Sequence, residues 1–158
     1  MSEEQIAYAQ QRKVRENLDK VEYRLQDYRN VNEKYDRIVS VGMFEHVGTA
    51  HYQEFFNKVY DLLNDSGVAL IHTIGRLNEP GNTDPWIDKY IFPGGYIPAL
   101  SETVSRVEKS GLSLTDVQIL KFHYAETLKR WRYNFYDNID KVKAVSYTHL
   151  TLPTKPSV

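Results

Sequence analysis

The sequence predicts an α/β protein with a doubly wound, mostly parallel sheet. Segments typical of strands alternate with segments typical of amphipathic helices, and parallel sheets need helical crossovers of this kind. Ile38–Val41 is apolar and largely β-branched, as expected for a strand buried on both faces. Val68–Gly75 has the same character apart from one histidine. An amphipathic helix is expected between these two strands, starting near Thr49 and carrying apolar residues up to Leu63.

The other elements of the N-terminal half follow from local patterns. Ser2-Glu3-Glu4-Gln5 fits a capping box, and a loose apolar stripe predicts a helix up to about Leu18. Apolar and polar residues alternate over Val21–Gln26, which predicts a half-exposed strand that ends at Asp27-Tyr28. Asn64–Gly67 is predicted to stop the helix that begins near Thr49.

The C-terminal half begins with a long irregular segment. Residues 76–98 lose periodicity and are rich in Pro and Gly, yet they hold large apolar side chains, so we expect a lid or insertion with a short helix. A helix over Leu100–Ser110, closed by Gly111, should follow. A strand over Ser113–Phe122 and a helix over Tyr124–Tyr136 complete the expected order.

Composition limits the function classes. The 158 residues suffice for one domain with a real core. A net charge of −1 gives no basic footprint for nucleic acid, and the absence of cysteine excludes disulfides and thiolate sites within these residues. No apolar run has the length of a membrane span, and the start lacks a signal-peptide pattern, so the expected location is cytoplasmic.

Glu45-His46 is the main candidate for chemistry. The pair follows the buried strand Ile38–Val41 after a break at Gly42, and ligands of open α/β sheets bind beyond the carboxyl ends of the strands. The alternative is that Glu45 merely places a negative charge before the next helix. His46 and His51 do not form a convincing metal pair, because no further ligand follows at useful spacing, and no metal site is predicted.

Several separated motifs together resemble one family. They lie in Asp36–Gly48, Leu70–Gly75, Asp84–Ile87 with Tyr90–Gly95, and His123-Tyr124 with Thr127-Leu128 and Trp131. Over roughly residues 2–136, the sequence is similar to the cyclopropane-fatty-acid synthases and the related mycolic-acid cyclopropane synthases and methyltransferases. The resemblance implies a Rossmann-like class I methyltransferase fold that uses S-adenosylmethionine. It also implies methyl transfer to the cis double bond of a phospholipid acyl chain, followed by closure of a cyclopropane ring.

The resemblance also implies catalytic roles. The family is expected to hold a bicarbonate ion as the base, with side chains that match Glu45, His72 and Tyr124 and with the backbone near Ile74. A carboxylate accepts the bicarbonate O–H, while His and Tyr donate to its oxygens. Aromatic faces such as Tyr124 and Phe44 would stabilise a carbocation by roughly 1–2 kcal/mol each. Without the resemblance, a lone histidine in a buried strand, such as His72, is more often a core residue.

The cofactor-binding residues implied by the resemblance lie in the first third of the chain. Gln5 matches a position near the ribose, and Asp27 with Tyr28 matches the turn that grips adenine. Gly42 and Phe44 match the floor beside the sulfonium. Two of these have simpler alternatives, because Asp27 is an ordinary turn residue and Gln5 fits the capping box alone.

The sequence departs from the family pattern at both ends. This sequence has no counterpart of three features that the family places upstream. These are the first strands, the Gly-rich turn that binds the methionine part of the cofactor, and an active-site cysteine. Residues 144–158 resemble a non-native read-through tail. We therefore expect residues 1–143 to be the C-terminal part of a methyltransferase catalytic domain that is inactive alone.

Two rival functions stay open at this point. One is methyl transfer to an amine or another small acceptor, and the other is a non-catalytic fragment. The expected partner is a phospholipid acyl chain, with no nucleic acid. Lys129–Tyr133 is basic and aromatic, which suits peripheral membrane contact, although a solvated helix face is the commoner reason. A homodimer of the parent protein is left open.

Overall fold

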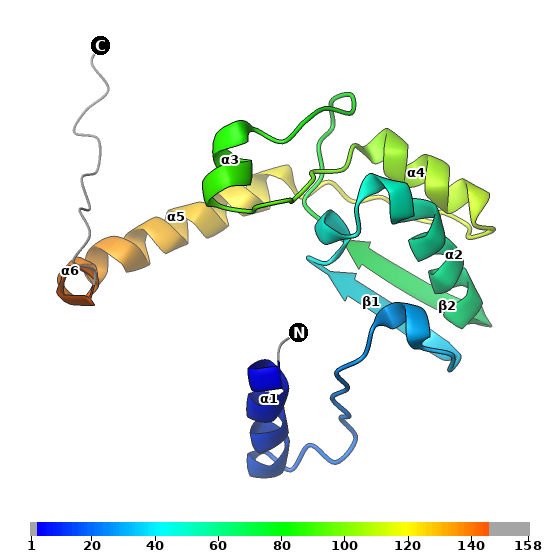
Figure 1. The fold of residues 1–158 in the computed structure, drawn as a ribbon, viewed down its shortest axis with the longest axis horizontal. Helices are drawn as coiled ribbons and strands as arrows, with labels where there is room; N and C mark the ends of the chain where they lie inside the picture. The colour runs from blue at the N-terminus through cyan, green and yellow to red at the C-terminus, as the bar shows by residue number, and fades with distance from the viewer. Residues whose placement is uncertain (1–2, 146–158) are drawn as a thin grey trace. The chain divides into compact units, whose positions relative to one another are not determined.

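The computed structural model describes residues 3–145, which fall into two compact units, one ending at Thr115 and one beginning at Asp116 (Figure 1). Ser2 of the predicted capping box and most of the predicted tail, residues 146–158, lie outside the described residues. Ala144 and Val145, which were also assigned to that tail, end a helix.

The sheet of the first unit is parallel, as predicted. Strand β1, Tyr35–Val41, pairs with strand β2, Leu63–His72, and the register places Val41 opposite His72. Both strands therefore end at the same edge, which brings the segments that follow them together.

One face of this sheet is covered by helices α2, Tyr52–Leu62, and α4, Leu100–Lys109 (Figure 1). The buried positions of α2 are spaced as i, i+3, i+4 and i+7, so they form one apolar stripe. Ile38, Ala69 and Ile71 of the sheet pack against this stripe. The buried core of the unit consists of Phe44, Tyr52, Phe55, Phe56, Val59, Leu63 and Val107.

The opposite face of the sheet is open, so the prediction of strands buried on both faces is wrong for the described residues. Val39 is 66% exposed and its cross-strand partner Leu70 is 60% exposed. Successive side chains of a strand point to opposite faces, and only the face that carries Ile38 and Ile71 meets α2.

The remaining helices largely agree with the sequence patterns. They are α1, Glu3–Arg15; α3, Pro85–Tyr90; α5, Lys121–Asp137; and α6, Ile139–Val145, of which only α6 was not expected. Three single 3-10 turns, η1, η2 and η3, cover Tyr28–Asn30, Phe44–His46 and Thr49–His51. Asp84 caps α3 by accepting from two backbone N–H groups, and Gly111, with φ +85°, follows α4 as predicted.

Two predicted strands are wrong. Val21–Gln26 and Ser113–Phe122 contain no strand in the structure, and residues 121 and 122 belong to α5. A strand needs a neighbouring strand for its backbone hydrogen bonds, and alternation alone cannot supply one. In the part of the chain that the structure describes, the only sheet is β1 with β2.

Asn64–Gly67, predicted to be a turn that stops the helix, instead forms part of strand β2. The helix ends at Leu62, one residue earlier than expected, and the chain enters β2 at once with Leu63. Asn64 Nδ2 donates to Asp36 Oδ1 at 2.8 Å, and Lys34 Nζ donates to the Leu63 carbonyl at 3.1 Å. These cross-strand contacts extend the pairing of β2 with β1 through an irregular register.

Candidate active site

The site is built where β1 and β2 end. The Gly42 N–H donates to the His72 carbonyl at 3.1 Å, which continues the strand pairing by one bond. Gly42 then adopts φ +65°, a conformation that glycine reaches without the steric cost of a side chain. The chain turns here into η2, and this turn carries Glu45 to the segment that follows β2.

Glu45 is held by contacts to two other segments. Its Oε1 accepts the Ile74 N–H at 2.6 Å, and its backbone carbonyl accepts the Tyr96 N–H at 3.3 Å. Its Oε2 is buried and has no hydrogen-bond partner among the described residues. A buried acceptor without a donor is costly, so this oxygen is suited to a group that brings a donor to it.

The structure brings Glu45 to Ile74 but records no contact between the Glu45 carboxylate and the His72 ring. His72 is the last residue of β2 and is exposed, on the open face that also carries Leu70. The simpler interpretation of His72 as a buried core residue is therefore wrong. Its part in catalysis stays a prediction.

Tyr124 lies in the second unit, in the first turn of α5, and is exposed. The structure describes the two units separately, so it does not test whether Tyr124 joins Glu45. Gln5 lies on the exposed surface of α1, and its proposed place near the ribose also stays a prediction.

Asp27 has the turn role that the sequence left open. Its carboxylate accepts the Arg29 N–H at 2.9 Å and Arg29 Nη2 at 2.6 Å, and so it caps η1. The hydrogen bonds from Arg29 lower the pKa of Asp27 to about 2, so this carboxylate is ionised at neutral pH. The ring of the neighbouring Tyr28 forms a T-shaped pair with the ring of Phe55, with 5.6 Å between ring centroids.

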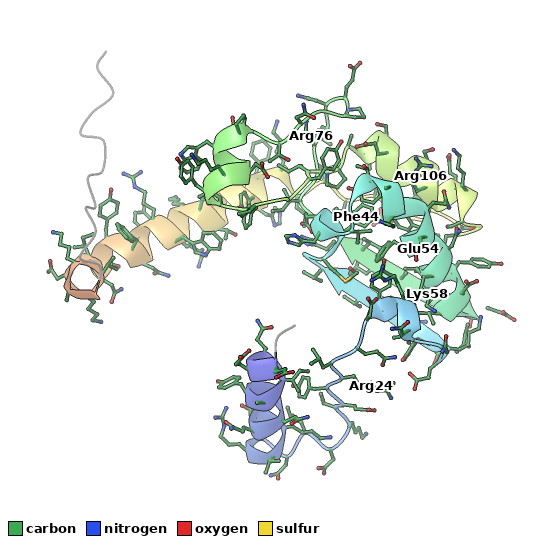
Figure 2. All side chains as sticks on the ribbon, in the orientation of Figure 1. Arg24, Phe44, Glu54, Lys58, Arg76 and Arg106 are labelled. Carbon is green, nitrogen blue, oxygen red and sulfur yellow. The ribbon has the colours of Figure 1, made fainter. Side chains whose placement is uncertain are left out.

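Phe44 belongs to the core. Figure 2 labels it at the turn that follows β1. Its side chain has no exposed surface, and its ring stacks on Tyr52 with 4.2 Å between centroids. This burial supports a packing role for the ring. Contact with a sulfonium or a carbocation through this ring is a prediction that the structure does not support.

Among the described residues, no group of three or more His, Cys, Asp or Glu side chains could hold a metal ion. His51 Nδ1 lies 3.2 Å from Glu54 Oε2, one helical turn away, which accounts for its position. Within this part of the chain, no helix combines the length and apolar character that crossing a membrane requires.

Sequence reasoning missed Tyr96, whose N–H donates to the Glu45 carbonyl, and two residues that contact Tyr96 in turn, Arg76 and Glu102. Tyr96 donates its O–H to both oxygens of Glu102, at 3.0 and 3.2 Å, and the Arg76 guanidinium lies over the Tyr96 ring. The sequence did contain a signal for two of these residues. Arg76 directly follows the second strand segment, and Glu102 lies in the first turn of a predicted helix.

A family model described as mycolic acid cyclopropane synthetase matches residues 1–152, nearly the whole chain. The chain belongs to the mycolic acid cyclopropane synthetase family. A curated member with a similar sequence is the cyclopropane-fatty-acyl-phospholipid synthase of Escherichia coli K12, 42% identical over 135 residues. That match covers 85% of this chain but only 34% of the E. coli protein, so the chain spans about a third of that relative.

The similarity to solved structures shows which fold class this family member has. The mycolic acid cyclopropane synthase CmaA1, complexed with SAH and CTAB, matches with a TM-score of 0.71 and 31% identity over 92% of this chain and 56% of its own. A coclaurine N-methyltransferase bound to N-methylheliamine and SAH matches with a TM-score of 0.75 and 25% identity, over 91% and 45%. The fold of this family member is therefore the Rossmann-like α/β fold of class I methyltransferases.

Proposed function

We propose that this chain is the part of an S-adenosylmethionine-dependent methyltransferase that holds the catalytic base for cyclopropane formation on phospholipid acyl chains. Family membership supports the reaction class. The observation that carries the proposal is the Glu45 carboxylate, with Oε1 fixed by Ile74 and Oε2 buried without a partner.

The proposed reaction joins a methyl group to a cis alkene and closes a ring. S-adenosylmethionine, when bound, supplies an electrophilic methyl group. The alkene π electrons would form the new bond to that carbon as its bond to the sulfonium sulfur breaks and S-adenosylhomocysteine leaves, so the positive charge passes to the acyl chain. A proton of the added methyl group would then pass to the base, the bicarbonate ion considered below, and the electron pair of that C–H bond would close the cyclopropane.

The residues present fit the bicarbonate ion that the family resemblance implies. Glu45 Oε2 needs a donor, and a bicarbonate O–H is one. The Ile74 N–H already donates to Glu45 Oε1, so its expected donation to the ion would be shared or indirect. His72 would donate to another oxygen of the ion, and the role of Tyr124 stays a prediction of the family resemblance alone.

For the cofactor, Asp27 is the residue whose chemistry fits best. Because its pKa is about 2, it offers a charged acceptor to the exocyclic amine of adenine at any physiological pH. Arg29 competes for the same oxygens, so Arg29 would have to leave part of the carboxylate free.

The test is a chimera in which this chain replaces the matching third of the E. coli synthase. In the chimera, Glu45→Gln should lower the yield of cyclopropane lipid roughly 10- to 100-fold while cofactor affinity changes less than about twofold. Gas chromatography of the acyl chains and titration with the cofactor measure the two effects.

Glu54→Gln is the matched control, because Glu54 is an exposed carboxylate of α2 that pairs only with His51. It should leave the yield unchanged. Equal yields from the Glu45→Gln chimera and its parent, or no lipid product from the parent chimera, would contradict the proposal.

The likeness to coclaurine N-methyltransferase favours one second candidate, methyl transfer to an amine. Incubation of the same chimera with labelled cofactor and either lipid vesicles or small amines separates the two acceptor classes. Label in the amine alone would support this second candidate.

A further inference from the structure

We propose that Arg76 is a positioning residue that fixes the end of the irregular segment 76–98 against Glu45. Its effect on catalysis rests on the proposed function. Its effect on the structure rests on the hydrogen bonds alone.

Arg76 ties the two ends of the segment together. Its N–H donates to the Pro98 carbonyl at 2.9 Å, and its carbonyl accepts the Leu100 N–H at 3.2 Å. Its side chain adds two bonds, from Nε to the Ile97 carbonyl at 3.1 Å and from Nη2 to the Asn82 carbonyl at 3.2 Å. One residue therefore holds both the outgoing and the returning part of the segment.

Arg76, labelled in Figure 2, is half-buried. Its Cζ lies 5.9 Å from the centroid of the Tyr96 ring, and it makes no ion pair with a carboxylate of the described residues. A Cβ at Gly81 would lie 2.7 Å from Arg76 Nη1, so the glycine leaves the space that the guanidinium fills. Two carbonyls and a ring face satisfy a cation that no carboxylate neutralises.

Tyr96 connects this anchored segment to Glu45 through hydrogen bonds. Its N–H donates to the Glu45 carbonyl, and its O–H donates to Glu102, which also accepts the Ala99 N–H at 2.9 Å. Burial and the hydrogen bond to Glu102 raise the pKa of Tyr96, so the phenol remains a donor at neutral pH. The Tyr96 backbone is thus held between α4 and the Glu45 turn.

Both segments that contact Glu45 are therefore anchored at Arg76. Ile74, which binds Glu45 Oε1, lies two residues before Arg76, and Tyr96, which binds the Glu45 carbonyl, lies under its guanidinium. Loss of the side chain should release both contacts, and the unpartnered Oε2 would then lose its fixed direction.

The structural test measures amide hydrogen exchange by NMR in the 158-residue chain. Arg76→Met should speed exchange at the Ile74 and Tyr96 amides about tenfold and leave the Phe56 amide in α2 unchanged. Arg76→Lys should restore part of the protection, because it keeps the charge and one donor direction. The control Arg37→Met removes an exposed arginine whose side chain bonds only the adjacent Asp36 carbonyl, and it should change none of these rates.

Rates within about twofold of the parent at both amides would overturn the proposal, as would equal acceleration at Phe56, which would show general destabilisation. A chain without protected amides at Ile74 and Tyr96 would overturn it too.

The catalytic test uses the chimera described above. Arg76→Met should lower kcat several-fold with an unchanged KM for the cofactor, because Glu45 contacts the base and not the cofactor, and Arg76→Lys should recover part of the loss. An unchanged kcat, or a raised KM alone, would overturn the positioning role. If the parent chimera forms no lipid product, the proposed function fails, while the exchange measurement still decides whether Arg76 orders the segment.

Discussion

At the scale of single residues, the polar atoms left without partners are the most informative. Four buried side-chain atoms of the described residues lack a hydrogen bond, among them Glu45 Oε2 and the Tyr52 hydroxyl. Glu45 lies at the carboxyl edge of the sheet, where a ligand can satisfy it. Tyr52 lies in the core at 1% exposure, where its unpaired hydroxyl should cost stability.

Tyr52→Phe should therefore stabilise the chain by about 1 kcal/mol at neutral pH, because it removes a buried hydroxyl and keeps the ring that stacks on Phe44. The benefit should grow in alkali. Burial, followed by the charges of Glu102 and other neighbours, raises the pKa of Tyr52 to about 12, above the ordinary value of 10.0 that it regains on unfolding.

The raised pKa means that the folded state holds this proton more tightly, so the parent loses stability as the pH rises from about 10 through about 12. Urea unfolding at pH 7, 10 and 11 measures the difference. A Phe variant that is less stable than the parent at pH 7 would show that the hydroxyl has a partner in solution.

At the scale of elements, the aromatic stripe of α2 holds the first unit together. Phe55 contacts the rings of Tyr28, Phe44 and Phe56 at centroid distances of 5.2 to 5.6 Å. These contacts connect α2 to η1 and to the turn that carries Glu45. The geometry of the candidate site therefore depends on the packing of one helix.

Phe55→Ala should destabilise the first unit by roughly 3–5 kcal/mol, since it removes a buried ring and leaves a cavity among three others. Denaturant unfolding followed by circular dichroism measures this loss. Asp61→Ala, on the exposed side of the same helix, is the control and should change stability by less than about 0.5 kcal/mol. A loss below about 1 kcal/mol for Phe55→Ala would contradict the core assigned here.

At the scale of the whole molecule, the most important feature is the open face of the sheet, which exposes apolar side chains. Val39, Val41, Val68 and Leu70 are all more than half exposed on that face. In the part of the chain that the structure describes, no element packs on this face to bury them. An uncovered apolar sheet face is a liability for self-association.

Replacing Val39 and Leu70 together with Thr should reduce self-association of the isolated chain at little cost in stability, because neither side chain is buried. Sedimentation velocity over a range of concentrations measures the association. Ile71→Thr, on the face that packs against the core, is the contrasting variant and should destabilise the chain instead. Unaltered association of the double variant would show that another surface is responsible.

The sequence by itself determined most of the local structure. Apolar spacing located α2, α4 and the two paired strands, and the resemblance of separated motifs indicated the family. The position of Glu45 shortly after an apolar strand segment was enough to predict that it would lie at the carboxyl edge of the sheet. Patterns of this kind work because they depend on near neighbours and on the regular geometry of helices and strands.

Only the tertiary structure decided which of these residues meet. Glu45 and Ile74 are 29 positions apart, and the Arg76 side chain bonds a carbonyl 21 positions away, so no local pattern contains either contact. The same holds for the failed strands at 21–26 and 113–122 and for the open sheet face. Strand pairing, burial and side-chain contacts depend on which distant segments are present to pack against, and a single stretch of sequence does not specify its partners.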